Sequence, residues 1–148
     1  MRKYVLDTNL YVRAFRSQEG AAELERYFAE FTPNTYLSSV VLHELLVGAS
    51  TVEKARQVRE DLVGPLARAG RVITPSHSAW EQAGSAIAAM ARKEGRDLRS
   101  VAKSLVNDFL LAASCRESGT VLITDNPSDF TLIRKYLAHE HVPAWPQR

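Results

Sequence analysis

Short apolar runs alternate with longer segments of helical character along this chain of 148 residues. The clearest run is Thr120–Thr124 (TVLIT), whose five residues are β-branched or aliphatic. Strands that alternate with helices are typical of an α/β domain with a mainly parallel sheet. The other strands are expected at Lys3–Leu6, Thr35–Ser38, 71–74 and 141–144.

The segments between these runs have the composition and end signals of helices. They predict helices through residue 15, over 20–31, 39–49, 76–93 and 101–117, and a short one ending near 136. A further helix is expected from residue 51, disturbed at Gly64-Pro65. The length suits one core, and no repeat or linker divides the chain. We therefore expect a single three-layer domain over 1–148, with four to five short strands flanked by helices.

Cysteine usage and hydropathy limit the compartment in which this chain is expected. The lone Cys115 excludes an intramolecular disulfide framework and a multi-cysteine metal site, and it fits a reducing compartment. Asp7 interrupts the N-terminal segment before an apolar signal core can form. The run 109–113 is far too short to span a bilayer. These features predict a cytoplasmic protein rather than a secreted or membrane protein.

The net charge of +2 is mild, but the basic residues are unevenly distributed. Segments 54–71 and 92–103 each hold five basic and two acidic residues, which gives +3 in each. Of the 19 basic residues 14 are arginine, which suits bidentate contact with phosphate. A solvated helix face is the commoner use of such a run, so charge alone does not identify a nucleic-acid surface.

Two aspartates directly follow predicted strands. Asp7 comes after the first strand and Asp125 after the strand Thr120–Thr124. In an open parallel sheet, the carboxyl ends of the strands form the crevice in which ligands bind. The two carboxylates therefore predict a site at that edge.

Two further acids project from apolar helix faces. Glu44 shares its face with Val40 and Val41, and Asp108 lies between apolar neighbours one turn away on either side. Burial of an unpaired carboxylate costs on the order of several kcal/mol, even after the surrounding protein relaxes. Each of these acids therefore needs a cation, a basic partner or a proton.

Each acid has a structural explanation when it is taken alone. Asp7 and Asp129 can cap helices, Asp125 can form an Asx turn, and Glu44 can pair with a buried arginine. Taken together, a shared divalent cation satisfies all of them. Hard oxygen ligands select Mg²⁺ or Mn²⁺ over zinc, and such sites bind phosphate oxygens. Four or five acids suit one ion or two.

Four segments in order resemble the PIN-domain nucleases, and within them the VapC-type toxins of toxin–antitoxin pairs. They are 5–9 (VLDTN), 42–48 (LHELLVG), 107–113 (NDFLLAA) and 121–130 (VLITDNPSDF). Each segment is weak evidence alone, but all four in this order cover nearly the whole chain. The resemblance implies a PIN-like fold.

The resemblance also implies roles for individual residues. Asp7, Glu44 and Asp108 correspond to metal ligands, and the fourth ligand is either Asp125 or Asp129. Many relatives carry arginine or another residue at the position of Asp125. Four polar residues would orient the carboxylates and water by hydrogen bonds: Thr8, Asn9, Thr124 and Asn126.

The activity implied by the resemblance is that of a Mg²⁺- or Mn²⁺-dependent endoribonuclease. Water attacks a phosphodiester and leaves a 5′-phosphate and a 3′-hydroxyl. The substrate would be tRNA, rRNA or mRNA. Toxin members form homodimers, and a small antitoxin inserts a segment, often with arginine or lysine, into the acidic cleft.

Basic residues near the expected site are candidates for contact with RNA phosphates. Arg96, Arg99 and Lys103 lead into the helix of Asp108. Arg13 and Arg16 lie near one another on the first helix. A plain solvated face explains both groups equally well.

Other functions remain open on the sequence alone. A housekeeping PIN nuclease in RNA processing has the same chemistry. A catalytically silent PIN-fold binding module would be expected to lose its acids, which are all present here. A haloacid-dehalogenase phosphatase needs a D-x-D-x-T turn, but residues 9 and 11 are Asn and Tyr. The acidic pocket of a receiver domain also fits poorly.

Overall fold

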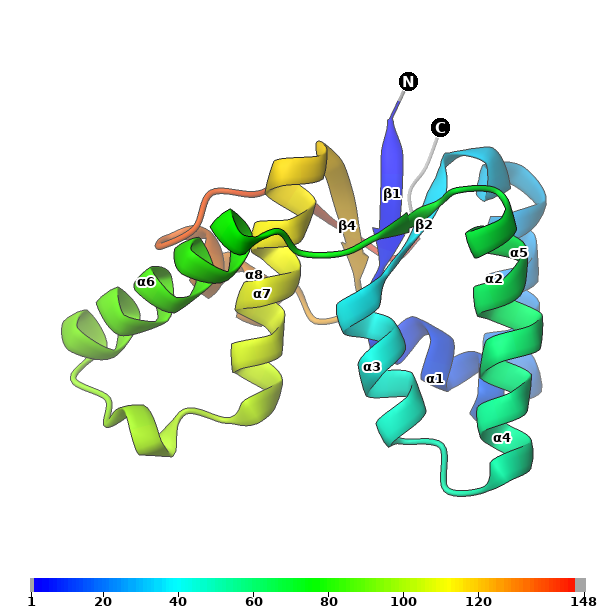
Figure 1. Cartoon of the computed structure of the whole chain (residues 1–148), viewed down its shortest axis with the longest axis horizontal. Helices are drawn as coiled ribbons and strands as arrows, with labels where there is room; N and C mark the ends of the chain where they lie inside the picture. The colour runs from blue at the N-terminus through cyan, green and yellow to red at the C-terminus, as the bar shows by residue number, and fades with distance from the viewer. Residues whose placement is uncertain (1, 146–148) are drawn as a thin grey trace.

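A five-stranded, fully parallel sheet forms the centre of the chain in a computed structural model that describes residues 2–145 (Figure 1). The strand order is β3-β2-β1-β4-β5, and each neighbouring pair is parallel. The strands are β1 (Lys3–Leu6), β2 (Thr35–Ser38), β3 (Val72–Ile73), β4 (Thr120–Thr124) and β5 (His141–Pro143). The parallel sheet expected from the alternating pattern is confirmed.

Helices cover both faces of this sheet. Figure 1 shows α6, α7 and α8 on one side and α2, α4 and α5 on the other. The α-helices are α1 (Thr8–Arg16), α2 (Gln18–Phe31), α3 (Ser39–Val47), α4 (Val52–Gln57), α5 (Gly64–Arg68), α6 (His77–Glu94), α7 (Lys103–Ser118) and α8 (Pro127–Arg134). Within residues 2–145, none of these helices is long and apolar enough to cross a membrane.

The middle of the sheet is the best-buried part of the fold. Every residue of β4 is buried, because this strand is paired on both edges and covered by α7. Leu122 and Ile123 of β4 are fully buried, as are Phe109 and Leu111 of α7. Strands of parallel sheets read as continuous apolar runs for this reason.

Several element boundaries differ from the sequence-based expectation. The strand expected over 71–74 is only Val72–Ile73, and the helix expected from 101 begins at Lys103 after a short 3-10 helix η3, Leu98–Ser100. The chain also stays helical across Gly64-Pro65, because a π-helical segment η2 (Val58–Val63) leads into α5. Pro65 then lies in the first turn of α5, directly after the π-helical segment.

The strand order reverses between β1 and β4. From β1 the chain moves to β2 and β3 on one side, and it then returns to place β4 on the other side. Crossovers therefore leave β1 and β4 in opposite directions, and in open parallel sheets ligands bind at the carboxyl ends of strands at such a reversal. The fold thus opens a crevice at the ends of these two strands.

Candidate active site

Asp7 lies at this reversal point and is only 6% exposed. Its N–H donates to the carbonyl oxygen of Ile123 on β4 (2.9 Å), which continues the β1–β4 pairing. Its Oδ1 accepts from the N–H of Thr8 (2.8 Å), and its Oδ2 accepts from the hydroxyl of Thr124 (2.8 Å). Asp7 therefore caps α1, and β4 holds its carboxylate in place.

Burial raises the pKa of Asp7 to about 6. The hydrogen bonds from Thr124 and Thr8 act in the opposite direction, because they stabilise the charged carboxylate. The negative charges of Glu44 and Asp125 raise the pKa further. Other acids therefore lie close enough to Asp7 to disfavour its ionisation.

Glu44 comes from α3, which begins after Ser38 at the end of β2. The Ser38 hydroxyl accepts from the N–H of Val40 (3.1 Å) and caps this helix. α3 packs against α1 and α7, and Glu44 is half-buried beside them. Its Oε1 accepts from the hydroxyl of Thr8 (2.9 Å). Thr8 therefore connects two acids that are far apart in the sequence.

Asp108 lies on α7, and burial raises its pKa to about 8. The charges of Asp7, Glu44 and Asp129 add to this increase, in that order. Within residues 2–145, no lysine, arginine or histidine nitrogen lies within 4.0 Å of a carboxylate oxygen of Asp7, Glu44 or Asp108. The cost of burying these acids is therefore not offset by a direct ion pair in the described part of the chain.

Asp129 is held by its neighbours at the start of α8. Its Oδ2 accepts from Asn126 Nδ2 (2.8 Å), and the N–H of Asn126 donates to the hydroxyl of Thr124 (2.9 Å). The negative charge of Asp129 also raises the pKa of Asp108 on α7. Thr124 and Asn126 thus orient acids from both β1 and α8.

Asp125 occupies a different position, beside Asp7 and a basic residue. Its Oδ2 lies 3.8 Å from Arg13 Nη1 on α1. Arg13 Nη2 also donates to Glu23 Oε2 on α2 (3.0 Å), and the indole of Trp145 donates to the same oxygen (3.4 Å). Glu23 is not among the site residues predicted from the sequence. Only the packing of α1 on α2 reveals its role in positioning Arg13.

The carboxylates of the described residues share one electrostatic environment but do not form a ready-made ligand cluster. No group of three or more carboxylate, imidazole or thiol side chains in residues 2–145 is drawn together closely enough to hold a metal ion. The acids nevertheless come from the ends of β1 and β4 and from α3, α7 and α8. The fold therefore brings their elements to the edge of the sheet where β1 and β4 end.

Comparison with known proteins identifies the family. The family model described as PIN domain matches residues 4–135, which is most of the chain. The chain belongs to the PIN-domain family. A comparison with proteins of curated description finds no match.

Solved structures with the same fold cover almost the whole PIN domain. It is similar to a chain in the structure of FitAB bound to an IR36 DNA fragment, with a TM-score of 0.69, 17% identity, and 98% of this chain and 97% of that chain covered. It is also similar to a chain of DNA-bound VapBC from Salmonella typhimurium, with a TM-score of 0.66, 21% identity, and 97% of this chain and 98% of that chain covered. A chain of VapBC2 from Rickettsia felis, bound to a promoter DNA fragment, has a TM-score of 0.60 and 23% identity to this chain, with 97% of this chain and 98% of that chain covered. These likenesses show the fold.

The polar residues expected to orient the acids of this PIN domain are placed differently from one another. Thr8, Thr124 and Asn126 each donate or accept a hydrogen bond at the acids, as described above. Asn9 is exposed, and its side chain makes no hydrogen bond to the residues described. Its expected role therefore stays a prediction.

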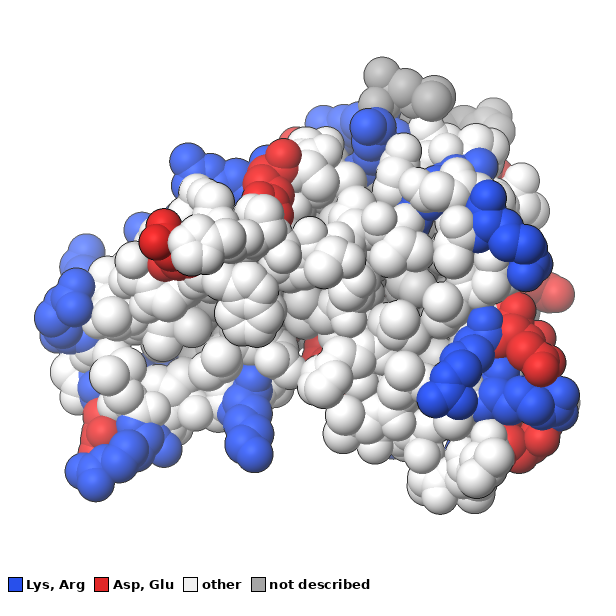
Figure 2. All heavy atoms as spheres, in the orientation of Figure 1, with Lys and Arg blue, Asp and Glu red and all other residues white. Residues whose placement is uncertain are grey.

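The basic residues near α7 lie at the end of the molecule where α6 meets α7. Arg99 pairs with Asp97 (3.2 Å), whereas Arg96 and Lys103 are exposed and form no ion pair within residues 2–145. Figure 2 shows basic side chains around this end, beside a largely uncharged face. Lys103 begins α7, so it lies roughly 7.5 Å along the helix axis from Asp108.

Proposed function

We propose that this PIN domain is a Mg²⁺- or Mn²⁺-dependent endoribonuclease that hydrolyses RNA phosphodiester bonds. The observation that carries the proposal is the group of carboxylates near the carboxyl ends of β1 and β4, of which Asp7 is buried and Glu44 and Asp108 are half-buried. Burial and neighbouring negative charges raise the pKa values of Asp7 and Asp108. Asp7, Glu44 and Asp108 have no basic partner within 4.0 Å in the described chain. Such an arrangement costs free energy in the isolated protein, and perturbed acids of this kind are concentrated at functional sites.

The donor set fits a hard divalent cation, because every candidate ligand is a carboxylate oxygen. Asp7, Glu44 and Asp108 would hold the cation, together with Asp129 or Asp125. When bound, such an ion makes water more acidic and offsets negative charge on a phosphodiester. Binding would also offset the repulsion that raises the pKa values of Asp7 and Asp108.

The residues around the acids restrict the orientation of each carboxylate. Thr124 and the N–H of Thr8 hold the two oxygens of Asp7, and the hydroxyl of Thr8 holds Glu44. Asn126 holds Asp129 in the same way. Fixed carboxylates lose little entropy when they bind a ligand, so these hydrogen bonds favour a pre-organised site.

The products follow from hydrolysis of a phosphodiester. An attacking water forms a bond to phosphorus, and the bond between phosphorus and the 3′ oxygen breaks. The oxygen takes a proton and leaves as a 3′-hydroxyl, while the other product carries a 5′-phosphate. This outcome is the one that the family resemblance implies.

The biological role that we propose is the toxin of a toxin–antitoxin pair. The chain resembles VapC-type toxins, and its structural neighbours are taken from complexes named VapBC and FitAB. We infer that a small cognate antitoxin neutralises the activity by covering the acidic crevice, that the toxin is a homodimer, and that both proteins act in the cytoplasm on tRNA, rRNA or mRNA.

Cleavage of total cellular RNA by the purified chain tests the proposed activity. The wild type should cleave RNA with Mg²⁺ or Mn²⁺, and a chelator should stop the reaction. Asp7→Asn, purified identically, should be inactive in both conditions, whereas a contaminating metal-independent ribonuclease would survive both changes. If wild type and mutant behave alike and no antitoxin has co-purified, the binding-module interpretation replaces the enzyme.

A further inference from the structure

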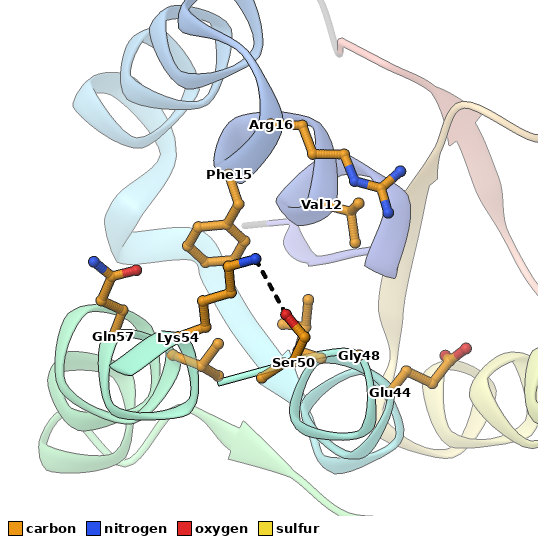
Figure 3. A pocket seen from close by; sticks show the side chains of 11 residues that line it. Val12, Phe15, Arg16, Glu44, Gly48, Ser50, Lys54 and Gln57 are labelled. Carbon is orange, nitrogen blue, oxygen red and sulfur yellow. Dashed lines mark hydrogen bonds between the residues drawn. The ribbon is translucent and has the colours of Figure 1, made fainter. Parts of the chain in front are cut away.

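A cavity of about 430 Å³ lies beside Glu44, between α1, α3 and α4 (Figure 3). Phe15 and Arg16 come from α1, and Lys54 and Gln57 come from α4. Its volume lies within the roughly 300–1,000 Å³ that is usual for ligand sites. Since Glu44 belongs both to this cavity and to the acidic group, the cavity adjoins the proposed active site.

The cavity combines three kinds of chemistry. Phe15 is 53% exposed, so a large aromatic surface faces solvent rather than the core. Arg16 has no acidic partner within 4.0 Å in residues 2–145, and the ammonium of Lys54 donates only to the hydroxyl of Ser50 (3.2 Å) among them. Gln57 adds an amide that can both donate and accept.

We propose that this cavity binds one unpaired nucleotide of an RNA strand, next to the phosphodiester held at the acidic group. The inference rests on the proposed nuclease function and names a subsite for its substrate. The base stacks on Phe15, as bases do on aromatic side chains in single-strand binding sites. Arg16 and Lys54 contact the flanking phosphates, and Gln57 hydrogen-bonds the edge of the base.

The charges around the cavity favour a nucleotide over an apolar protein segment. An apolar segment would cover Arg16 and Lys54 without supplying a negative charge, which is costly for a cation. A nucleotide supplies a phosphate for these cations and a flat ring for Phe15. Figure 3 shows Glu44 on the side of α3 away from Lys54, so this cation and the carboxylate lie on different sides of the cavity.

Binding of short RNA tests this subsite without relying on catalysis. The probes are fluorescein-labelled single-stranded RNA pentanucleotides, and the dissociation constant is measured by anisotropy in EDTA, in an Asp7→Asn background. Phe15→Leu should weaken binding about ten-fold or more, whereas Phe15→Tyr should stay within about two-fold. Trp80→Leu is the matched control, because Trp80 is also exposed (61%) but lies outside the cavity, and it should leave affinity unchanged.

Salt dependence tests the phosphate contact proposed for Lys54. Lys54→Gln should reduce the slope of log K against log salt by about 0.7, the value for one phosphate contact with a single strand. Lys135→Gln, at the exposed end of α8, should leave the slope unchanged. Thermal unfolding of each variant shows that the fold is intact.

The outcomes separate this inference from the nuclease proposal. If the wild type cleaves RNA with metal but Phe15→Leu matches its parent in affinity and cleavage, the nucleotide subsite is wrong and the nuclease stands. The subsite is also wrong if Phe15→Leu and Lys54→Gln weaken binding of the co-expressed antitoxin while RNA affinity is unchanged. If the wild type neither cleaves RNA nor binds the pentanucleotides, both proposals fail.

Discussion

Asp7 and Asp97 have the same local role and opposite electrostatic environments. Each precedes a helical segment and accepts a backbone N–H, from Thr8 in one case (2.8 Å) and from Arg99 in the other (3.0 Å). Burial raises the pKa of Asp7 to about 6. The backbone and side-chain hydrogen bonds from Arg99 lower the pKa of the exposed Asp97.

The contrast shows that capping alone does not decide how an aspartate titrates. A hydrogen bond to a carboxylate favours its charged form in both regions. At Asp7 the effect is outweighed, because β4 and α1 exclude water and other acids lie nearby. The strand pairing therefore keeps the Asp7 carboxylate in a position that disfavours its charge. In the α6–α7 connection, the ion pair with Arg99 stabilises the charge of Asp97.

Neutralising one buried acid should affect activity far more than neutralising the exposed one. We expect Asp108→Asn to lower RNA cleavage by more than about 100-fold, since loss of even an indirect partner of a metal ligand costs roughly 10–100-fold. Asp97→Asn should stay within about two-fold of wild type. Initial rates with Mn²⁺ give the comparison, and equal losses in the two variants would place the chemistry elsewhere.

Removing a hydrogen bond to Asp7 should have the next largest effect. Thr124→Val keeps the shape of the side chain but leaves Asp7 Oδ2 without its donor, so cleavage should fall roughly 10–100-fold. Thr124→Ser should recover most of the rate because it restores the hydroxyl. Ser100→Ala, which removes a hydroxyl near Asp97, is the matched control and should retain full activity. A fully active Thr124→Val would show that Asp7 needs no positioning.

The stability of the metal-free protein should fall as pH rises. The folded pKa values of Asp7 and Asp108 are about 6 and about 8, above the ordinary 3.8. Between about pH 4 and 8 the folded state therefore binds more protons than the unfolded chain, and the free energy of unfolding decreases with pH. The two shifts alone correspond to about 5 kcal/mol between pH 5 and 8. Because Asp108 is only half-buried, solvent screening should reduce the loss to on the order of 1–3 kcal/mol, measured by urea denaturation in EDTA.

Variants of single acids show which residues cause the decrease of the free energy of unfolding with pH. Asp108→Asn should flatten it, because the variant cannot take up the proton, whereas Asp97→Asn should preserve it. His139 and His141, whose pKa values burial lowers, contribute with the opposite sign, but the contribution cancels when each variant is compared with its parent. An unchanged slope in Asp108→Asn would contradict the buried, protonated carboxyl group.

The smallest expected effect is a difference between Arg96 and Arg99 of the α6–α7 connection in the salt dependence of RNA binding. Arg99 is already paired with Asp97, whereas Arg96 has no such partner in the described chain. Arg96→Gln should therefore lower the salt slope of RNA binding by up to about 0.7, and Arg99→Gln by less. Anisotropy titrations over a series of salt concentrations measure both slopes. The reverse order would mean that RNA displaces Asp97 from Arg99.

The central part of the fold could be predicted because local pattern and tertiary environment agree there. The run Thr120–Thr124 is apolar because both edges and both faces of β4 are covered. The edges of the sheet were less predictable. β3 is limited to Val72–Ile73 because only these residues pair with β2, and sequence pattern does not determine where pairing stops.

The candidate site divides in the same way. Acids at strand ends and on apolar helix faces are visible in the sequence, because burial of charge is unusual enough to be informative. The Glu23–Arg13–Asp125 contacts and the cavity beside Phe15 were not predicted. The first depends on the packing of α1 against α2, and the second on the position of α1 beside α4. In the sequence alone, these side chains are typical of solvent-exposed positions, and their partners come from distant segments.

The hydrogen bond between Asp7 and Thr124 joins residues 117 positions apart. During translation, the partner of Asp7 exists only after 117 further residues have been synthesised. At roughly 5–20 residues per second, this interval lasts about 6 to 23 seconds. A chain that has not reached Thr124 on the ribosome therefore lacks this hydrogen bond, and any nuclease activity that depends on it cannot begin before Thr124 has been made.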